Sequence, residues 1–410
     1  MVCDCFIAFN RNMLSPYLKR KAVSINKELD FNDLSCFYIS SIKEIKKMNN
    51  KIRISAKQMM SLLMMTIIST AILSIPAVTS KHAGHDMWVS PIFSSISGLI
   101  TAFIILQLHK LYPNETIFQY SKHIVGTFLS KCIGLAYLLY ILLVTSIIVR
   151  EYADFILTSL LYSTPLVVII GVMVILCAYS VKSGLEVFAR ASQVFLPIYI
   201  FSLLVLLLLF HEFDVKNMLP LFEGKWKSML HGALQPALWF NQIFYMGILL
   251  PYVKDKATKK VVGYKVILYS LIVMFSLNII CLFLFGENVD SYQFPVFTAF
   301  RYIYIPPFFE RFESVLVVIW VLGVFIKISL FYFTLCLGTA QWLGVEKEKT
   351  FVFPYGILII IIALWVSTNL ADLNKFIEST IPVLEIGLYV LIPLSLLLLS
   401  FIRKKRKASV

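Results

Sequence analysis

Long apolar stretches alternate with short polar ones along most of this chain. Between residues 57 and 402 we find ten runs rich in Leu, Ile, Val and Phe. They cover residues 57–80, 88–110, 131–156, 165–181, 187–210, 229–252, 262–286, 313–341, 352–369 and 379–402. A helix needs about 20 apolar residues to cross the hydrocarbon core of a bilayer, and most of these runs are long enough. The pattern therefore predicts an all-α integral membrane protein with ten transmembrane helices.

Composition and charge support a membrane protein. The chain is 59% hydrophobic and only 15% charged, whereas soluble domains carry about 25% charged residues. Its net charge of +14 does not indicate nucleic-acid binding, because Lys and Arg fall in alternate loops and in the basic tail, residues 403–410. Basic residues concentrate on the cytoplasmic side of membrane proteins. We therefore expect both termini to be cytoplasmic and the lipid bilayer to surround the bundle.

The first 50 residues differ from the rest of the chain. They are of mixed polarity and contain no run long enough to span a membrane. We interpret residues 1–50 as an N-terminal extension, with Met48 as an alternative start. Residues 51–410 then form the ten-helix bundle, with a first half at 51–210, a second half at 225–402 and the basic tail at 403–410.

Two of the apolar runs contain breaks at corresponding places in the two halves. In the first run Ser69, Thr70, Ala71 and Ile72 precede Pro76, and in the sixth Asn241 and Gln242 follow a proline. Paired breaks of this kind indicate a binding site near the bilayer midplane, where half-helix ends offer free N–H and carbonyl groups. We predict a pocket for an amino acid or similar zwitterion there. The alternative interpretation is an ordinary pair of proline kinks.

Lys327 is a charge in the middle of an apolar stretch, residues 314–339. At about 1.5 Å per helical residue it lies roughly 20 Å from either end, beyond the reach of a lysine side chain. A charge at that depth normally faces a wet cavity or a partner within the bundle. Glu151 is one candidate partner. Arg150 is another candidate charged residue, although it can also pair with Asp154 four residues later on its own helix.

The chain lacks the motifs of common enzymes. It contains no HExxH motif, no phosphate-binding loop and no spacing typical of a catalytic triad. Its seven cysteines are scattered without a CxxC pair, so we infer neither a metal site nor a disulfide framework. We expect a protein that is not an enzyme and needs no cofactor.

Several segments together resemble the B subunit of GerA-type spore germinant receptors. They are residues 51–76 (KIRISAKQMMSLLMMTIISTAILSIP), the tract from Trp88, and Arg311-Phe312-Glu313-Ser314 leading through Trp320 to Phe325-Ile326-Lys327-Ile328-Ser329. The likeness covers roughly residues 51–402. The family resembles the amino acid–polyamine–organocation transporters, which implies two inverted five-helix repeats with broken first and sixth helices. It usually has more glycine at the first break than this chain has.

The resemblance also implies a function. It places the protein in the inner membrane of the spore, beside an A subunit and a lipoprotein C subunit, where it senses a small nutrient such as an amino acid and triggers germination. In this fold the eighth helix passes the break in the first, where sodium-coupled relatives hold a cation. We therefore hypothesise that the Lys327 ammonium takes the place of that cation, bound to carbonyls around residues 69–72.

Two other functions stay open at this point. The first is an amino acid/proton symporter with the same fold, in which Lys327 or Glu151 carries the proton. The second is a scaffold that anchors partner subunits and binds no ligand. The sequence does not identify the nutrient, because the rotation of each helix about its axis is not readable from the chain.

Overall fold

Helices account for almost all of the structure. The computed structural model describes residues 53–220, 222, 226–255, 259–303, 312–367 and 370–408. The predicted extension at residues 1–50, the alternative start at Met48 and the residue Arg311 lie outside the described residues. Within those ranges the only β-pairing is one isolated bridge between Ile54 and Val253.

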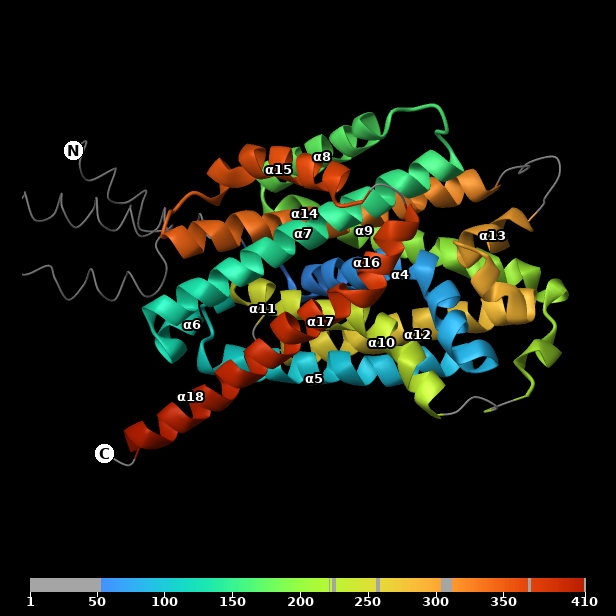
Figure 1. Cartoon of the computed structure of the whole chain (residues 1–410). Helices are drawn as coiled ribbons and strands as arrows, with labels where there is room; N and C mark the ends of the chain where they lie inside the picture. Colours follow the sequence, from blue (N-terminus) through green and yellow to red (C-terminus); the bar gives the residue numbers. More distant parts are fainter. Residues whose placement is uncertain are drawn as a thin grey trace, which may run out of the picture. The chain divides into compact units, whose positions relative to one another are not determined.

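The elements follow one another as shown in Figure 1. In chain order they are α4 (Ala56–Ala83), η1 (Gly84–Val89), α5 (Ser90–Leu111), α6 (Ile117–Val125), α7 (Thr127–Ser159), α8 (Leu166–Ser183), α9 (Leu185–Leu204), η2 (Val205–Glu212), η3 (Val215–Met218), α10 (Trp226–Asn241), η4 (Gln242–Tyr245), α11 (Met246–Leu249), η5 (Leu250–Tyr252), α12 (Lys259–Phe285), η6 (Gly286–Ser291), α13 (Pro295–Arg301), α14 (Phe312–Leu343), η7 (Glu348–Phe351), α15 (Val352–Trp365), α16 (Leu370–Ser379), α17 (Ile381–Glu385), η8 (Ile386–Leu391) and α18 (Ile392–Ala408).

The prediction of an all-α membrane protein is confirmed, since each of the ten predicted ranges overlaps helical segments of the described chain. Eight segments of the described chain are long and apolar enough to cross a membrane. One of them, Ala56–Leu111, contains two of the predicted spans, and none of the eight covers the range 229–252. The number of ten transmembrane helices and the division into halves at 51–210 and 225–402 stay predictions.

Helix α4 forms the centre of the packing. It contacts α9, α10, α12 and α14, and every residue from Leu62 to Leu73 is buried. Burial on all sides means that other helices, and not lipid, surround this part of α4. In Figure 1 its blue ribbon lies within the bundle, with α5 and α10 on one side and α7 and α14 on the other.

The predicted break in the first helix was wrong. Helix α4 runs as one α-helix from Ala56 to Ala83, through Ser69–Ile72 and past Pro76. Proline removes one backbone donor, and membrane helices tolerate this when neighbouring groups satisfy the backbone. Glycine is the residue that unwinds most readily, and this stretch has none. The sequence therefore weakens the helix at one position without interrupting it.

The predicted break in the sixth span is confirmed. Helix α10 ends at Asn241, and the 3₁₀ turn η4 then runs from Gln242 to Tyr245 before the four-residue helix α11. A 3₁₀ stretch has three residues per turn, so it rotates the following side chains relative to the α-helix before it.

Candidate functional site

A cavity of about 230 Å³ lies against the middle of α4. For comparison, a cavity of about 150 Å³ in another protein admits benzene. The walls of the cavity beside α4 come from five helices, α4, α7, α10, α14 and α16, and from η6 with the segment that follows it. The lining residues are Thr70, Leu73, Ser74, Ala77, Val78, Lys81, Glu151, Phe155, Gln235, Trp239, Asp290, Tyr292, Gln293, Phe294, Trp320, Asn374, Ile377 and Glu378. A small amphipathic molecule therefore has both the room and the polar partners that it needs.

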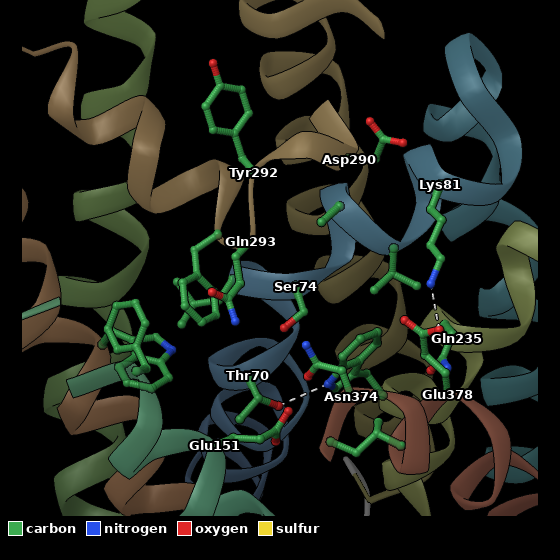
Figure 2. A pocket seen from close by; sticks show the side chains of 18 residues that line it. Thr70, Ser74, Lys81, Glu151, Gln235, Asp290, Tyr292, Gln293, Asn374 and Glu378 are labelled. Atoms are coloured by element: carbon green, nitrogen blue, oxygen red, sulfur yellow. Dashed lines mark hydrogen bonds and ion pairs between the residues drawn. The ribbon is translucent and has the colours of Figure 1, made fainter. Parts of the chain in front are cut away.

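The cavity has a buried end and an exposed end. Figure 2 shows Thr70 and Glu151 in the lower part of the view and Asp290 and Tyr292 at the top. Lys81 and Asp290 are exposed to solvent, whereas Thr70 is buried. Lys81 forms an ion pair with Glu378 at 2.8 Å, and the two side chains are 53% and 31% exposed. The cavity thus leads from an exposed ion pair to the buried hydroxyl of Thr70 and the partly buried carboxylate of Glu151.

Thr70 is the hydrogen-bonding centre of the buried end. Its Oγ1 accepts one hydrogen bond from the Lys327 ammonium at 2.6 Å and another from the Trp239 indole N–H at 3.0 Å. Lys327 itself is only 1% exposed. A hydroxyl has two acceptor lone pairs and one donor hydrogen, so these two bonds use both lone pairs. The hydrogen of Thr70 is left to donate to a further acceptor.

Glu151 brings a carboxylate to the same end of the cavity. Its side chain lines the cavity, and it interacts electrostatically with Lys327. Among the described residues no carboxylate oxygen lies within ion-pair distance of the Lys327 nitrogen, so the interaction acts across a short gap. Glu385 is the second carboxylate that interacts with Lys327, and it does not line the cavity.

The hypothesis that Lys327 lies beside residues 69–72 agrees with the structure, but its partner differs. The ammonium binds the Thr70 hydroxyl instead of a backbone carbonyl. The Ser69 carbonyl accepts hydrogen bonds from Trp320 Nε1 at 2.5 Å and from the Tyr199 hydroxyl at 3.2 Å. Pro76 leaves the Ile72 carbonyl without its helical donor, but the hydrogen bond that the structure shows for Lys327 goes to the side chain of Thr70.

The other predicted ligand-binding residues lie next to the cavity and not in its wall. Ser69, Ala71 and Ile72 are buried between helices. Asn241 accepts hydrogen bonds from Ser97 and Thr101 of α5, at 2.7 and 3.1 Å. Gln242 is buried too and, like the other four, is absent from the lining. Their role in ligand binding stays a prediction.

Two lining residues of α10 escaped the sequence reasoning. Gln235 and Trp239 reach the cavity from the turns just before the break. They lie six and two residues before Asn241, on a different face of the helix. The nearby proline at 236 indicated that this segment contributes to the site. Only the rotation of α10 about its axis shows which of its side chains line the cavity.

Arg150 forms the intrahelical ion pair with Asp154 that the sequence analysis gave as its alternative. Its Nε donates to Asp154 at 2.9 Å, which is the intrahelical pair that the spacing allows. Its Nη1 donates to the carbonyl oxygens of Ser367, at 2.8 Å, and Ala363, at 3.2 Å. These carbonyls lie at and beyond the C-terminal turn of α15, where a cation is stabilised by the helix dipole. Arg150 therefore fastens α15 to α7.

The described part of the chain brings no group of three or more His, Cys, Asp or Glu together in a way that could hold a metal ion. The chemistry that the cavity offers is hydrogen bonding and charge. Its lining contains three hydroxyl groups, three carboxylates, three amides, two indoles and the Lys81 ammonium. Such a set binds and orients a small polar molecule.

Comparison with solved structures shows that the fold is that of LeuT-type transporters. The structure of MhsT in complex with L-phenylalanine matches with a TM-score of 0.60 and 11% identity, over 86% of this chain and 99% of that one. A Na⁺-coupled sialic acid symporter matches with a TM-score of 0.60 and 12% identity, over 83% and 80%. The protein thus has a transporter fold, which is built from two inverted repeats.

Sequence comparison narrows this class to one family. A profile of the spore germination protein family matches residues 53–371, and the chain belongs to that family. Spore germination protein KB of Bacillus subtilis (strain 168) is 24% identical over 87% of this chain and 97% of its own. Spore germination protein YndE of the same organism is 27% identical over 86% and 98%, and protein XB of Bacillus anthracis is 24% identical over 80% and 92%.

Proposed function

We propose that this protein is the membrane subunit of a spore nutrient-germinant receptor and that it binds a small nutrient, such as an amino acid, in the cavity beside Thr70. The observation that carries the proposal is the buried end of the cavity, where Thr70, Glu151 and Lys327 meet in a member of the spore germination protein family. A buried charged group of this kind marks a functional site in membrane proteins by default.

The cavity suits both ends of an α-amino acid. Glu151 supplies an anion for the ligand's ammonium group, and the Thr70 hydroxyl has a hydrogen to donate to the ligand's carboxylate. Phe155, Trp239 and Trp320 offer apolar surface for a side chain.

The receptor acts with partners in this proposal. An A subunit and a lipoprotein C subunit would receive the signal, as the family resemblance implies. The protein would lie in the inner membrane of the spore with both termini in the cytoplasm, as the placement of basic residues favours. The ligand shifts a population between two conformations, and it can do so only by the difference between its affinities for the two. No reaction is catalysed.

The experiment replaces Lys327 by Met in spores that depend on this receptor. We expect Lys327→Met to reach the membrane in normal amount and to lose the response to a mixture of the twenty protein L-amino acids. The exposed Lys182 provides the matched control, since Lys182→Met removes a surface charge that stacks on Phe353. A normal dose–response curve for Lys327→Met would exclude a role of this ammonium in ligand response.

The amino acid/proton symporter is the second candidate, and the transporter fold favours it. Uptake of labelled amino acids into proteoliposomes at two pH values separates the two functions. Accumulation that depends on a pH gradient supports the symporter, whereas saturable binding without accumulation supports the receptor. A scaffold without a ligand would show no thermal protection by any amino acid.

A further inference from the structure

Glu385 is a buried carboxylate that the proposed binding site does not use. Its side chain is only 2% exposed and lies where α17 passes into η8, a π-helical segment. One oxygen, Oε2, accepts a hydrogen bond from the Tyr140 hydroxyl at 3.1 Å. The other oxygen, Oε1, has no hydrogen-bond partner among the described residues. A buried acceptor without a partner is costly, so such groups in native proteins call for an explanation.

A packed aromatic cluster connects Glu385 to Lys327. The Lys327 nitrogen lies 5.9 Å from the centre of the Phe331 ring, and that ring packs on Tyr245 at 4.2 Å. The hydroxyls of Tyr245 and Tyr389 are hydrogen-bonded at 2.8 Å, and Tyr389 meets Tyr140 edge to face at 5.5 Å. Dense packing of this kind transmits a displacement from one end to the other, because interiors are not readily compressed.

The Lys327 ammonium has unused capacity as well. It carries three N–H donors, and the structure shows one hydrogen bond, to Thr70. Both Glu151 and Glu385 interact electrostatically with it. One carboxylate belongs to the cavity and the other does not. The Lys327 ammonium thus interacts electrostatically with two carboxylates, those of Glu151 and Glu385, and is hydrogen-bonded to neither.

We propose that Glu385 is a positioning residue, which draws the Lys327 ammonium away from Thr70 when a ligand ammonium occupies the cavity beside Glu151. The inference rests on the proposed function. Two ammonium groups near one carboxylate repel each other, and the repulsion is strong where the dielectric constant is low. The negative charge of Glu385 attracts the displaced ammonium, which lowers the free energy needed for the ligand to bind.

The displacement would also explain how occupancy reaches the end of the chain. Glu385 adjoins η8, and η8 continues into α18. π-Helical segments of this kind occur often at functional sites and contain hydrogen bonds of irregular register. A stronger attraction between Lys327 and Glu385 would therefore act on a helix that can change its register and that lies outside the lining of the cavity.

The test measures the concentration of the amino-acid mixture that gives half-maximal germination, and separately the maximal rate. Glu385→Gln keeps the size of the side chain and an acceptor for Tyr140 but removes the charge. We expect the half-maximal concentration to rise on the order of five- to tenfold, at the low end of couplings between linked sites, with the maximal rate kept. Glu385→Asp keeps the charge and is expected to stay within about twofold of the natural protein on the same scale.

Asp86 provides a matched control, since it is also a carboxylate with 2% exposure, accepting from the backbone N–H of Phe222. Asp86→Asn is expected to lower the amount of receptor, and hence the maximal rate, without a change in half-maximal concentration. An unchanged half-maximal concentration in Glu385→Gln would overturn the inference. So would an equal rise in Glu385→Asp, because the charge would then not be the cause.

Two further comparisons separate a failure of the inference about Glu385 from a failure of folding or of the proposed function. If Glu385→Gln does not accumulate, the double variant with Lys327→Met is expected to accumulate better, because the buried ammonium is then removed together with one of the two carboxylates that balance its charge. No improvement contradicts the inference. If Lys327→Met responds normally, the proposed function fails. If Lys327→Met loses the response while Glu385→Gln keeps its sensitivity, only the role of Glu385 fails.

Discussion

Replacing Thr70 by Val tests the hydrogen bonds on which the buried end of the cavity depends. Valine has nearly the shape of threonine but no hydroxyl. The substitution leaves the Lys327 ammonium, 1% exposed, without the acceptor that it has at 2.6 Å. It also removes the acceptor for Trp239 Nε1 at 3.0 Å, although Trp239 is only partly buried and can turn toward the cavity.

The expected loss of stability follows from these two contacts. A hydrogen bond to a charged group contributes about 1.5–3 kcal/mol, and a neutral one about 0.5–1.5 kcal/mol. We therefore expect Thr70→Val to lower the free energy of unfolding by about 2–4 kcal/mol. With an entropy of unfolding of about 2.1 cal/mol/K per residue over about 360 residues, this corresponds to a Tm lower by roughly 3–5 °C.

Thermal unfolding of the purified protein in detergent measures the effect, and Thr66 provides the control. Thr66 lies one turn earlier on α4, is fully buried, and donates only to the Leu62 carbonyl of its own helix, at 2.7 Å. That bond contributes little, because the carbonyl already has a helical partner. We expect Thr66→Val to change the Tm by less than a third of the Thr70→Val effect. Equal shifts in the two variants would refute the reasoning.

Two further substitutions test the packing that holds the site. Arg150→Met leaves the buried carboxylate of Asp154 unpaired and is expected to lower the free energy of unfolding by about 3–5 kcal/mol, measured by the same unfolding assay. The double variant with Asp154→Leu should recover most of this loss. An absence of recovery would contradict the pairing. Gly98→Ala places a Cβ 2.9 Å from that of Phe240 and should cost about 1–3 kcal/mol. Gly171→Ala, with no atom within 4 Å, should be neutral or stabilising, so a loss at both glycines would argue against the close contact of α5 with α10.

Much of the fold could be predicted from the sequence, because the thickness of the bilayer sets a minimum length for each membrane-spanning helix. Ten apolar runs predicted helices at positions where the structure has them, since a run of about 20 apolar residues has few alternatives in a membrane. The break after Asn241 was predicted correctly from a proline and a polar pair. The break near Ser69 was not, because a proline lowers helical stability locally and the surrounding helices then decide whether the backbone stays wound.

The depth of Lys327 in its helix could be counted along the chain, and with it the need for a partner inside the bundle. The identity of that partner could not, because Thr70 lies 257 residues away and meets Lys327 only through the packing of α14 on α4. The orientation of Asn241 could not be predicted either: its side chain faces α5, and Trp239 of the same helix lines the cavity instead. Hydrophobicity specifies which segments enter the membrane, whereas the rotation of each helix depends on contacts with several others at once.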